Sequence, residues 1–278
     1  APDHIAAVGA EIEDRLIKLE NILSAVYNLR ELTPRSKDHV ISYGERLLAP
    51  IVGAALRQRG IASTVLDGCE AGILTTPQHG ESTSLLRSDE RIQKKIVPLI
   101  KKEIPVIMGF MGCTTDGIIT TLGRSGSDYS ASIIGAGIDA DEIWIWTDVD
   151  GIMTCDPRIV PGARPIEAIS YREAAELAYF GAKVIHPSTI QPAVNLGIPV
   201  RVKNTFEPDH PGTIIVPAAA GSGVRAIACK KGITLVSVSS SRMLLAYGFL
   251  RRIFEIFEKH QTSVDLIAIT EAVERELA

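Results

Sequence analysis

Residues 120–130 form the stretch that most restricts how this chain can fold and what it can bind. They read Thr-Thr-Leu-Gly-Arg-Ser-Gly-Ser-Asp-Tyr-Ser and stand directly before an apolar pattern over 131–138 that predicts a helix. Glycines let a backbone approach a ligand closely, and the helix N-terminus that follows adds partial positive charge. The guanidinium of Arg124 can grip a carboxylate or a phosphate through two parallel hydrogen bonds. The stretch therefore predicts an anion-binding turn. The plainer alternative is a polar loop in which Ser127 caps the helix.

Strand and helix patterns alternate along most of the chain. The expected elements are helices over 2–29, 36–59, 89–102, 171–180 and 189–196, and strands over 62–66, 104–110, 142–146 and 199–203. Asp116-Gly117 predicts a hairpin turn between 111 and 122. Because short connections join these alternating elements, we expect an α/β fold with a mostly parallel sheet and helices on both faces.

The composition shifts at 217–223, where small residues indicate a linker. Beyond it we expect a strand over 233–238, a helix over 248–259, a strand over 264–269 and a helix over 271–277. This βαβα fragment is too small to be a comfortable domain alone. The predicted organisation is a large α/β domain over 1–220, followed by an incomplete α+β region over 224–278.

Composition narrows the class of protein. The net charge of −4 and the lack of a basic stripe interleaved with aromatics argue against a nucleic-acid binder. No apolar run approaches the ~20 residues of a membrane span, and the first residues do not resemble a signal peptide. Cys69, Cys113, Cys155 and Cys229 show no Cys-x-x-Cys spacing and no histidine at metal-ligand spacing. We therefore expect buried free thiols in a reducing compartment, and no metal site built by the protein.

Polar residues follow three of the expected strands. Phe110-Met111-Gly112 comes after the strand that begins at 104, Thr147-Asp148 after the strand at 142–146, and Lys203-Asn204 after the strand at 199–202. Ligands of open α/β sheets bind beyond the carboxyl ends of the strands. One crevice could therefore collect these three ends together with the glycine turn.

Phosphoryl transfer asks a protein mainly for positioning and for positive charge around the moving group. Arg124, Arg158 and Lys183 could supply that charge, and Asp148 and Asp156 could hold metal-bound or ribose groups. Plainer alternatives stay open, namely a surface turn in which Arg158 makes a solvated ion pair, and a solvated Lys183. The chain has no Walker motif, no protein-kinase signature and no dinucleotide-binding glycine loop.

Glu45 lies in the middle of an expected helix beside Gly44. Glycine costs ~1 kcal/mol relative to alanine in a helix interior, which indicates close packing or ligand approach on the face of Glu45. The alternative is an exposed helical acid.

Taken together, several segments resemble the aspartokinases of the amino acid kinase family. They occur in the order expected for that family over about residues 30–215, and the tail over 241–266 is similar to the start of an ACT regulatory region. The matching segments are 42–46 (Ser-Tyr-Gly-Glu-Arg), 109–112 (Gly-Phe-Met-Gly), 120–131, 146–151 (Trp-Thr-Asp-Val-Asp-Gly), 155–158 (Cys-Asp-Pro-Arg), 176–187 and 202–206.

The resemblance implies an enzyme that uses ATP and Mg²⁺ to phosphorylate the side-chain carboxylate of L-aspartate, giving 4-phospho-L-aspartate. That reaction is the first step towards lysine, threonine and methionine. It also implies a cytoplasmic homodimer or homotetramer, plastid-located if the source is a plant, with lysine or threonine as an allosteric effector.

The resemblance also assigns residue roles. Arg124 would take the α-carboxylate of aspartate, Asp128 its amino group or the surroundings of the phosphoryl group, and Phe110 would wall the pocket. The implied aspartate-binding residues are Glu45, Phe110, Arg124, Ser125, Gly126, Ser127 and Asp128. The implied nucleotide-binding residues are Thr147, Asp148, Met153, Arg158, Lys183 and Val184. The implied catalytic residues are Arg124, Asp128 and Lys183.

The chain departs from the family pattern in several places. The family opens with a strand and a Lys-Phe-Gly-Gly-Thr-Ser loop, which does not occur here, so we expect a first segment to be missing and activity to be lost without its lysine. Met153 stands where tyrosine is common, and Ser125 where glycine is usual. The alternatives are a related kinase for glutamate, N-acetylglutamate or UMP, and a non-catalytic amino-acid sensor.

Overall fold

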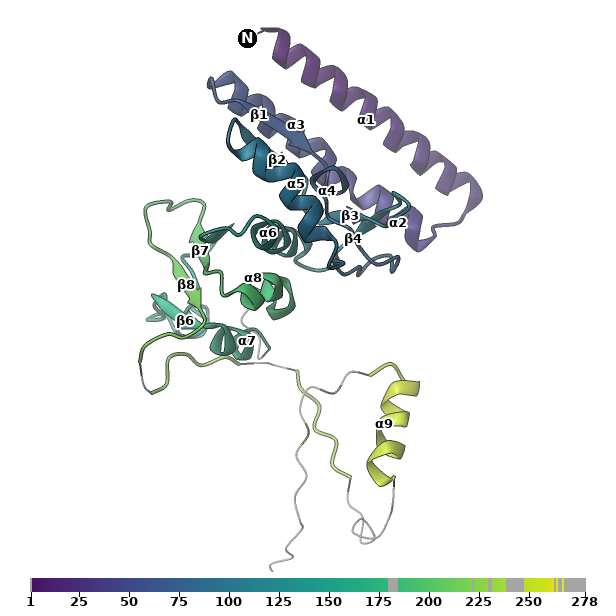
Figure 1. The fold of residues 1–278 in the computed structure, drawn as a ribbon. Coiled ribbons are helices and arrows are strands. Elements are labelled where there is room, and N and C mark those ends of the chain that lie inside the picture. The colour runs from purple at the N-terminus through teal and green to yellow at the C-terminus, as the bar shows by residue number, and fades with distance from the viewer. Residues whose placement is uncertain are drawn as a thin grey trace, which may run out of the picture. The chain divides into compact units, whose positions relative to one another are not determined.

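The computed structural model describes residues 2–179, 185–221, 223–229, 232–238 and 248–262, together with residues 264 and 267. The chain divides into two compact units, 1–230 and 231–278. Figure 1 shows the fold coloured along the chain. Within the described part, no helix is long and apolar enough to cross a lipid bilayer.

The N-terminal part of the first unit is helical. Helix α1 (Pro2–Leu29) lies along α3 (Tyr43–Gln58), and α2 (Pro34–Ile41) joins them (Figure 1). The first helix was predicted correctly. The helix predicted over 36–59 is instead two helices that meet at Ser42, whose hydroxyl donates to the carbonyl of His39 at 2.7 Å. A serine that bonds a nearby carbonyl competes with the regular helix ladder, which accounts for the interruption.

The first strand layer is a parallel pair, β1 (Ser63–Leu66) and β2 (Ile104–Ile107). On one face, Ala49 of α3 packs near Val65 and Val106. On the other face, Leu66 and Ile107 pack with side chains of α5 (Ser88–Ile100) and α6 (Gly126–Gly137). Helices therefore cover both faces of this layer, as predicted.

A hairpin follows β2. Strands β3 (Met111–Cys113) and β4 (Ile119–Thr121) pair antiparallel, with Met111 opposite Thr121. The turn at Asp116-Gly117 is confirmed, and Gly117 adopts a φ of 77° there. The short helix α4 (Gly68–Ala71) lies against β3, since a Cβ on Gly68 would stand 2.0 Å from the carbonyl oxygen of Met111.

A second sheet has the order β5-β7-β8-β6. Its strands are β5 (Ile143–Thr147), β6 (Ala168–Ser170), β7 (Val200–Asn204) and β8 (Thr213–Val216). The pairs β5–β7 and β6–β8 are parallel, and β7–β8 is antiparallel. The apolar core of this sheet, around Ile145, Val202 and Ile215, packs with side chains of α7 (Tyr171–Tyr179), the 3-10 helix η1 (Pro187–Ile190) and α8 (Gln191–Leu196). The predicted α/β class is confirmed, although β6 and β8 were not predicted.

In the second unit, α9 (Phe249–Lys259) confirms the predicted helix. The strand predicted over 233–238 is wrong, because these residues have neither helix nor strand structure. Their backbone finds no ladder partner among the described residues, and a strand requires one. The helix predicted over 271–277 lies outside the described residues, as does the strand predicted over 264–269 apart from residues 264 and 267.

The expectation of four buried free thiols is also wrong. Cys69 of α4 and Cys113 of β3 form a disulfide with their Cα atoms 5.2 Å apart. Cys155 is half-buried and free, and Cys229 is exposed and free. The bridge follows from the close approach of α4 to β3, which brings together residues separated by 44 positions.

Candidate functional site

The glycine turn leads directly into α6. Gly123 and Ser125 have φ values of 77° and 54°, the left-handed region that glycine adopts most easily. Helix α6 begins at Gly126 with Ser125 as its N-cap residue, so the alternative in which Ser127 caps the helix is wrong. The first amides of the helix lack partners within it and present donors to an anion.

Phe110 joins this turn from the short segment between β2 and β3. Its backbone also adopts a left-handed φ, of 64°, and its N–H donates to Ser130 Oγ at 2.8 Å. Ser130 Oγ in turn donates to the carbonyl of Gly126 at 2.8 Å. A Cβ on Gly126 would lie 2.7 Å from Cδ2 of the Phe110 ring, so only glycine fits beneath that ring.

Glu45 reaches the same turn from α3. The Ser127 hydroxyl donates a hydrogen bond to the carboxylate of Glu45. Burial raises the pKa of Glu45, and the bond from Ser127 opposes that rise in part. Burial also raises the pKa of Asp128. A Cβ on Gly44 would meet nothing within 4 Å, so close packing does not account for this glycine, and ligand approach on the face of Glu45 stays a prediction.

We call Glu45, Phe110 and residues 123–128 the glycine-turn group. Arg124, its one guanidinium, is exposed and makes no hydrogen bond or ion pair with any residue that the structure describes. A group of residues that offers an exposed guanidinium and two half-buried carboxylates suits a ligand that carries both a carboxylate and an amino group.

The ends of β5 and β7 form a second set of polar residues. Thr147 pairs with Asn204 in register, and the N–H of Thr205 donates to the carbonyl of Thr147 at 2.8 Å. Asp148 is exposed and accepts a bond from Thr147 Oγ1 at 3.1 Å. The side chain of Asn204 donates to Asp150 Oδ1 at 2.7 Å.

Lys203 is directed differently from the prediction. Its ammonium lies 5.0 Å from the ring centre of Trp144 and 5.3 Å from that of Trp146. The side chain therefore contacts the indole face of β5, where cation–π attraction holds it, rather than the loops beyond the strand ends.

Met153 and Arg158 lie in the loop after β5. Met153 is half-buried and forms an isolated bridge with Pro165. Arg158 binds Asp156 through Nε at 3.0 Å and Nη2 at 2.9 Å, with a side chain that is 80% exposed. This is the surface-turn geometry named above as the plainer alternative. We call Thr147, Asp148, Met153 and Arg158 the strand-end group. Lys183 and Val184 lie outside the described residues.

Helix α6 connects the two groups. Its first turn carries the glycine-turn group, and a Cβ on Gly135 near its end would lie 2.5 Å from Cδ1 of Ile143, at the start of β5. The end of α6 therefore packs against the start of β5. In an open α/β sheet a helix that precedes a strand generally runs back along it, so we expect the start of α6 and the end of β5 to face the same crevice.

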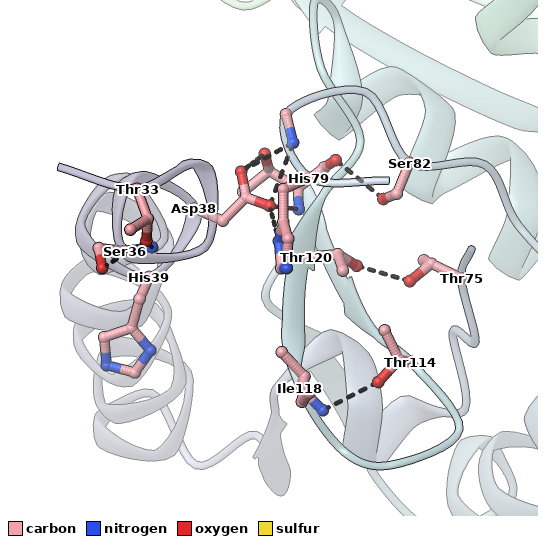
Figure 2. A network of polar contacts seen from close by, with 12 residues as sticks. Thr33, Ser36, Asp38, His39, Thr75, His79, Ser82, Thr114, Ile118 and Thr120 are labelled. Carbon is pink, nitrogen blue, oxygen red and sulfur yellow. Dashed lines mark hydrogen bonds and ion pairs between the residues drawn. The ribbon is translucent and has the colours of Figure 1, made fainter. Parts of the chain in front are cut away.

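A further set of residues was not predicted. Asp38 of α2 is fully buried and bonds to His79, Gly80 and Thr121, the last residue of β4 (Figure 2). Asp38 was not among the predicted site residues. No local signal marks its partners, because they stand 41 to 83 positions away.

Comparison with known proteins gives a consistent result. Residues 4–204 match the amino acid kinase family. The chain is 41% identical to aspartokinase 3, chloroplastic, of Arabidopsis thaliana, over 94% of this chain and 48% of that protein. It is 35% identical to lysine-sensitive aspartokinase 3 of Escherichia coli, over 94% of this chain and 58% of that protein. The chain thus spans about half the length of the relatives it matches.

Solved structures agree with these relatives. Aspartokinase III of E. coli in complex with aspartate and ADP superposes with a TM-score of 0.78 at 31% identity, covering 95% of this chain and 59% of that one. The same enzyme in complex with lysine and aspartate gives a TM-score of 0.77, also at 31% identity, over 96% of this chain and 60% of that one. The matched span from 4 to 204 contains both groups of residues described above, and the chain belongs to the amino acid kinase family.

Proposed function

We propose that this chain is the catalytic part of an aspartokinase, which transfers the γ-phosphoryl group of ATP to the side-chain carboxylate of L-aspartate. The product is 4-phospho-L-aspartate. The observation that carries the proposal is the glycine-turn group, in which the exposed guanidinium of Arg124 belongs to the same turn as the half-buried carboxylate of Asp128, and Ser127 of that turn interacts with the half-buried Glu45. Similarity to an enzyme solved with aspartate and ADP supports it.

The residues would divide the work as follows. Arg124 binds the α-carboxylate of aspartate, and Glu45 or Asp128 accepts hydrogen bonds from its amino group. Phe110 walls the pocket and excludes water from one side. The first amides of α6 offer donors to the negative charge that gathers around the transferring group. The acceptor carboxylate is itself the nucleophile, so the protein mainly positions and shields the reactants.

The strand-end group would hold ATP. Thr147, Asp148, Met153 and Arg158 line the proposed nucleotide site, and Lys183 and Val184 are proposed with them. Lys183, with Arg124 and Asp128, is proposed to be catalytic.

Magnesium is usually bound through one or two carboxylates together with substrate phosphates. Within the described residues, no three His, Cys, Asp or Glu side chains are grouped to hold a metal ion. The exposed Asp148 could supply the one carboxylate ligand that such an ion needs. Because the phosphates would supply the other ligands, the ion would arrive bound to ATP. When bound, it would neutralise phosphate charge.

The finer expectations belong to the whole protein. We propose a role at the start of lysine, threonine and methionine biosynthesis, with lysine or threonine as effector. The domain division at 1–220 and 224–278, the ACT character of the second part and a homodimeric or homotetrameric state are proposed with it. So is a cytoplasmic location, or a plastid one in a plant.

The test compares ATP turnover with aspartate and with glutamate in the full-length protein. We expect turnover that depends on aspartate. Arg124→Lys keeps the charge but loses the two-pronged contact, and it should raise the KM for aspartate by about 10–100-fold with little change in the KM for ATP. Arg172→Lys, at an exposed arginine of α7, is the matched control. Turnover without aspartate dependence would reject the proposal, and amino-acid binding without nucleotide binding would favour a sensor.

A further inference from the structure

The carboxylate of Asp38 is fully buried, and both of its oxygens accept hydrogen bonds (Figure 2). Its Oδ1 accepts from Thr121 Oγ1 at 2.5 Å and from the N–H of Gly80 at 3.0 Å. Its Oδ2 accepts from His79 Nδ1 at 2.7 Å, and from the N–H groups of Gly80 at 3.1 Å and Thr121 at 3.3 Å. Because an ionised carboxylate only accepts, Nδ1 of His79 carries the proton.

These bonds join two parts of the glycine-turn group. Asp38 lies on α2, which continues through Ser42 into α3 and so into Glu45. Thr121 ends β4 and leads through Leu122 into Gly123 and Arg124. One carboxylate therefore links the helix pair that carries Glu45 to the strand that carries Arg124.

The loop at 79–82 completes the link. Ser82 donates to the carbonyl of Thr121 through its N–H at 3.0 Å and its hydroxyl at 2.8 Å. The carbonyl oxygen of Gly80 would stand 3.1 Å from a Cβ on Gly123. The loop that Asp38 holds is therefore packed directly against the turn that presents Arg124.

Burying this carboxylate is costly. No lysine or arginine among the described residues pairs with Asp38, and a buried carboxylate without such a partner depends on its hydrogen bonds. Apolar side chains could pack these segments together with less desolvation. A carboxylate whose two oxygens both accept hydrogen bonds also fixes the geometry between α2, the loop at 79–82 and the end of β4.

We infer that Asp38 is a positioning residue for amino-acid binding, which sets the spacing between Glu45 and the Arg124 turn. The inference rests on the proposed function. It predicts a selective effect, because the bonded segments lead to the glycine-turn group and not to the strand-end group. Loss of the Asp38 bonds should weaken aspartate binding and leave ATP binding nearly unchanged.

The experiment uses four variants of the full-length protein. Asp38→Asn places an amide donor among the four donors that make these five hydrogen bonds, and Thr121→Val removes one hydroxyl at nearly constant shape. Thr121→Ser restores that hydroxyl, and Asp116→Asn makes the same chemical change as Asp38→Asn in the exposed hairpin turn. Calorimetry gives the dissociation constants of aspartate and of ATP, thermal unfolding monitors stability, and amide hydrogen exchange reports on residues 122–128.

We expect Asp38→Asn to raise the dissociation constant of aspartate at least about tenfold, with less than about twofold change for ATP. Thr121→Val should act in the same direction, Thr121→Ser should approach the wild type, and Asp116→Asn should match it. Exchange over 122–128 should quicken in the first two variants only. If Asp38→Asn does not fold, the two Thr121 variants decide the question.

Equal losses of aspartate and ATP affinity, or no loss of either, would overturn the inference and leave the network a purely structural one. If the wild-type protein binds no aspartate, the proposed function fails. In that case amide hydrogen exchange decides whether the Asp38 hydrogen bonds position the turn at 122–128. Unchanged exchange in Thr121→Val would reject this positioning role.

Discussion

Around the glycine-turn group the backbone is held in conformations that side chains rarely adopt, whereas around the strand-end group it is relaxed and open to solvent. Phe110 and Ser125 have φ values of 64° and 54°. Between 147 and 158 no residue other than glycine has a positive φ, and Asp148 and Arg158 are exposed.

This difference in backbone conformation indicates how each region would bind its ligand. Left-handed backbone persists where surrounding contacts fix it, and such positions gather at binding sites. The bonds among Phe110, Ser130 and Gly126 do this at the glycine turn. That region is ready to orient a small ligand before it arrives, while the strand-end group offers an open surface for a larger one. Changes in the first should therefore affect aspartate and leave ATP alone.

The Cys69–Cys113 bridge provides the largest expected effect on stability. It braces β3, which follows Phe110, and the strand-end region has only the free thiol of Cys155. Closing a loop of this length stabilises a fold by about 2–4 kcal/mol. Cys69→Ser should lower the free energy of unfolding in urea by about that amount and raise the KM for aspartate more than that for ATP.

Cys155→Ser is the control for the bridge, since it removes a half-buried thiol without breaking a cross-link. A loss of stability in Cys155→Ser as large as that in Cys69→Ser would show that the bridge does not brace the glycine-turn region.

Gly126→Ala should produce the next effect, on catalysis. The new methyl group would stand 2.7 Å from the ring of Phe110 and force ring or helix to shift. A misplacement of about 1 Å in a site can lower rates about 100-fold, so we expect kcat/KM for aspartate to fall by that order. Gly44→Ala, where a Cβ would meet nothing within 4 Å, should leave kcat/KM unchanged. Similar rates for the two variants would contradict the close packing beneath Phe110.

Glu45→Gln tests the electrostatics of the same group. Burial raises the pKa of Glu45 above its ordinary value of 4.5, so the folded state favours the protonated form. The stabilisation is present below the ordinary pKa and is lost as the pH rises through the raised one. Glu45→Gln should therefore melt at most about 3 °C above the wild type at pH 7.5 and converge with it near pH 4, while binding aspartate more weakly.

Glu90→Gln, at an exposed acid on α5, is the control for the loss of a charge. The desolvation argument would be rejected if Glu45→Gln melted above the wild type at pH 4 but not at pH 7.5. The difference in melting temperature would then have the opposite dependence on pH.

The elements that the sequence predicted best are those whose pattern is local. The helical spacing of apolar residues in α1 and α5, the Thr-Val pair of β1 and the alternation of valine with charged residues in β7 predict helix or strand directly. Strands β6 and β8 were not predicted, because they gain their structure from pairing with each other across the chain, which leaves no local pattern. The Cys69–Cys113 bridge was not predicted for the same reason, since no local pattern encodes a contact 44 positions away.

The site was predictable as a set of residue types and not as a geometry. The glycines and Arg124 predicted an anion-binding turn. Nothing in the sequence indicated that Phe110, a bulky residue, would adopt a left-handed φ. The contact between Ser127 and Glu45 joins side chains 82 positions apart and depends on the tertiary fold. Asp38 is the clearest case, since its role follows only from its partners.

The smallest expected effect concerns Arg158, whose assignment to the nucleotide site competes with a plain surface turn. Its ion pair with Asp156 is exposed, and exposed pairs add little stability, so Arg158→Gln should not change the melting temperature. If Arg158 also contacts a phosphate, the KM for ATP should rise roughly 3–10-fold, while that for aspartate stays constant. Arg172→Gln, which breaks the exposed pair with Glu176, is the matched control. An unchanged KM for ATP would leave Arg158 as a turn residue and reduce the strand-end group to Thr147, Asp148 and Met153, whereas a raised KM for aspartate would show that the two groups are not independent.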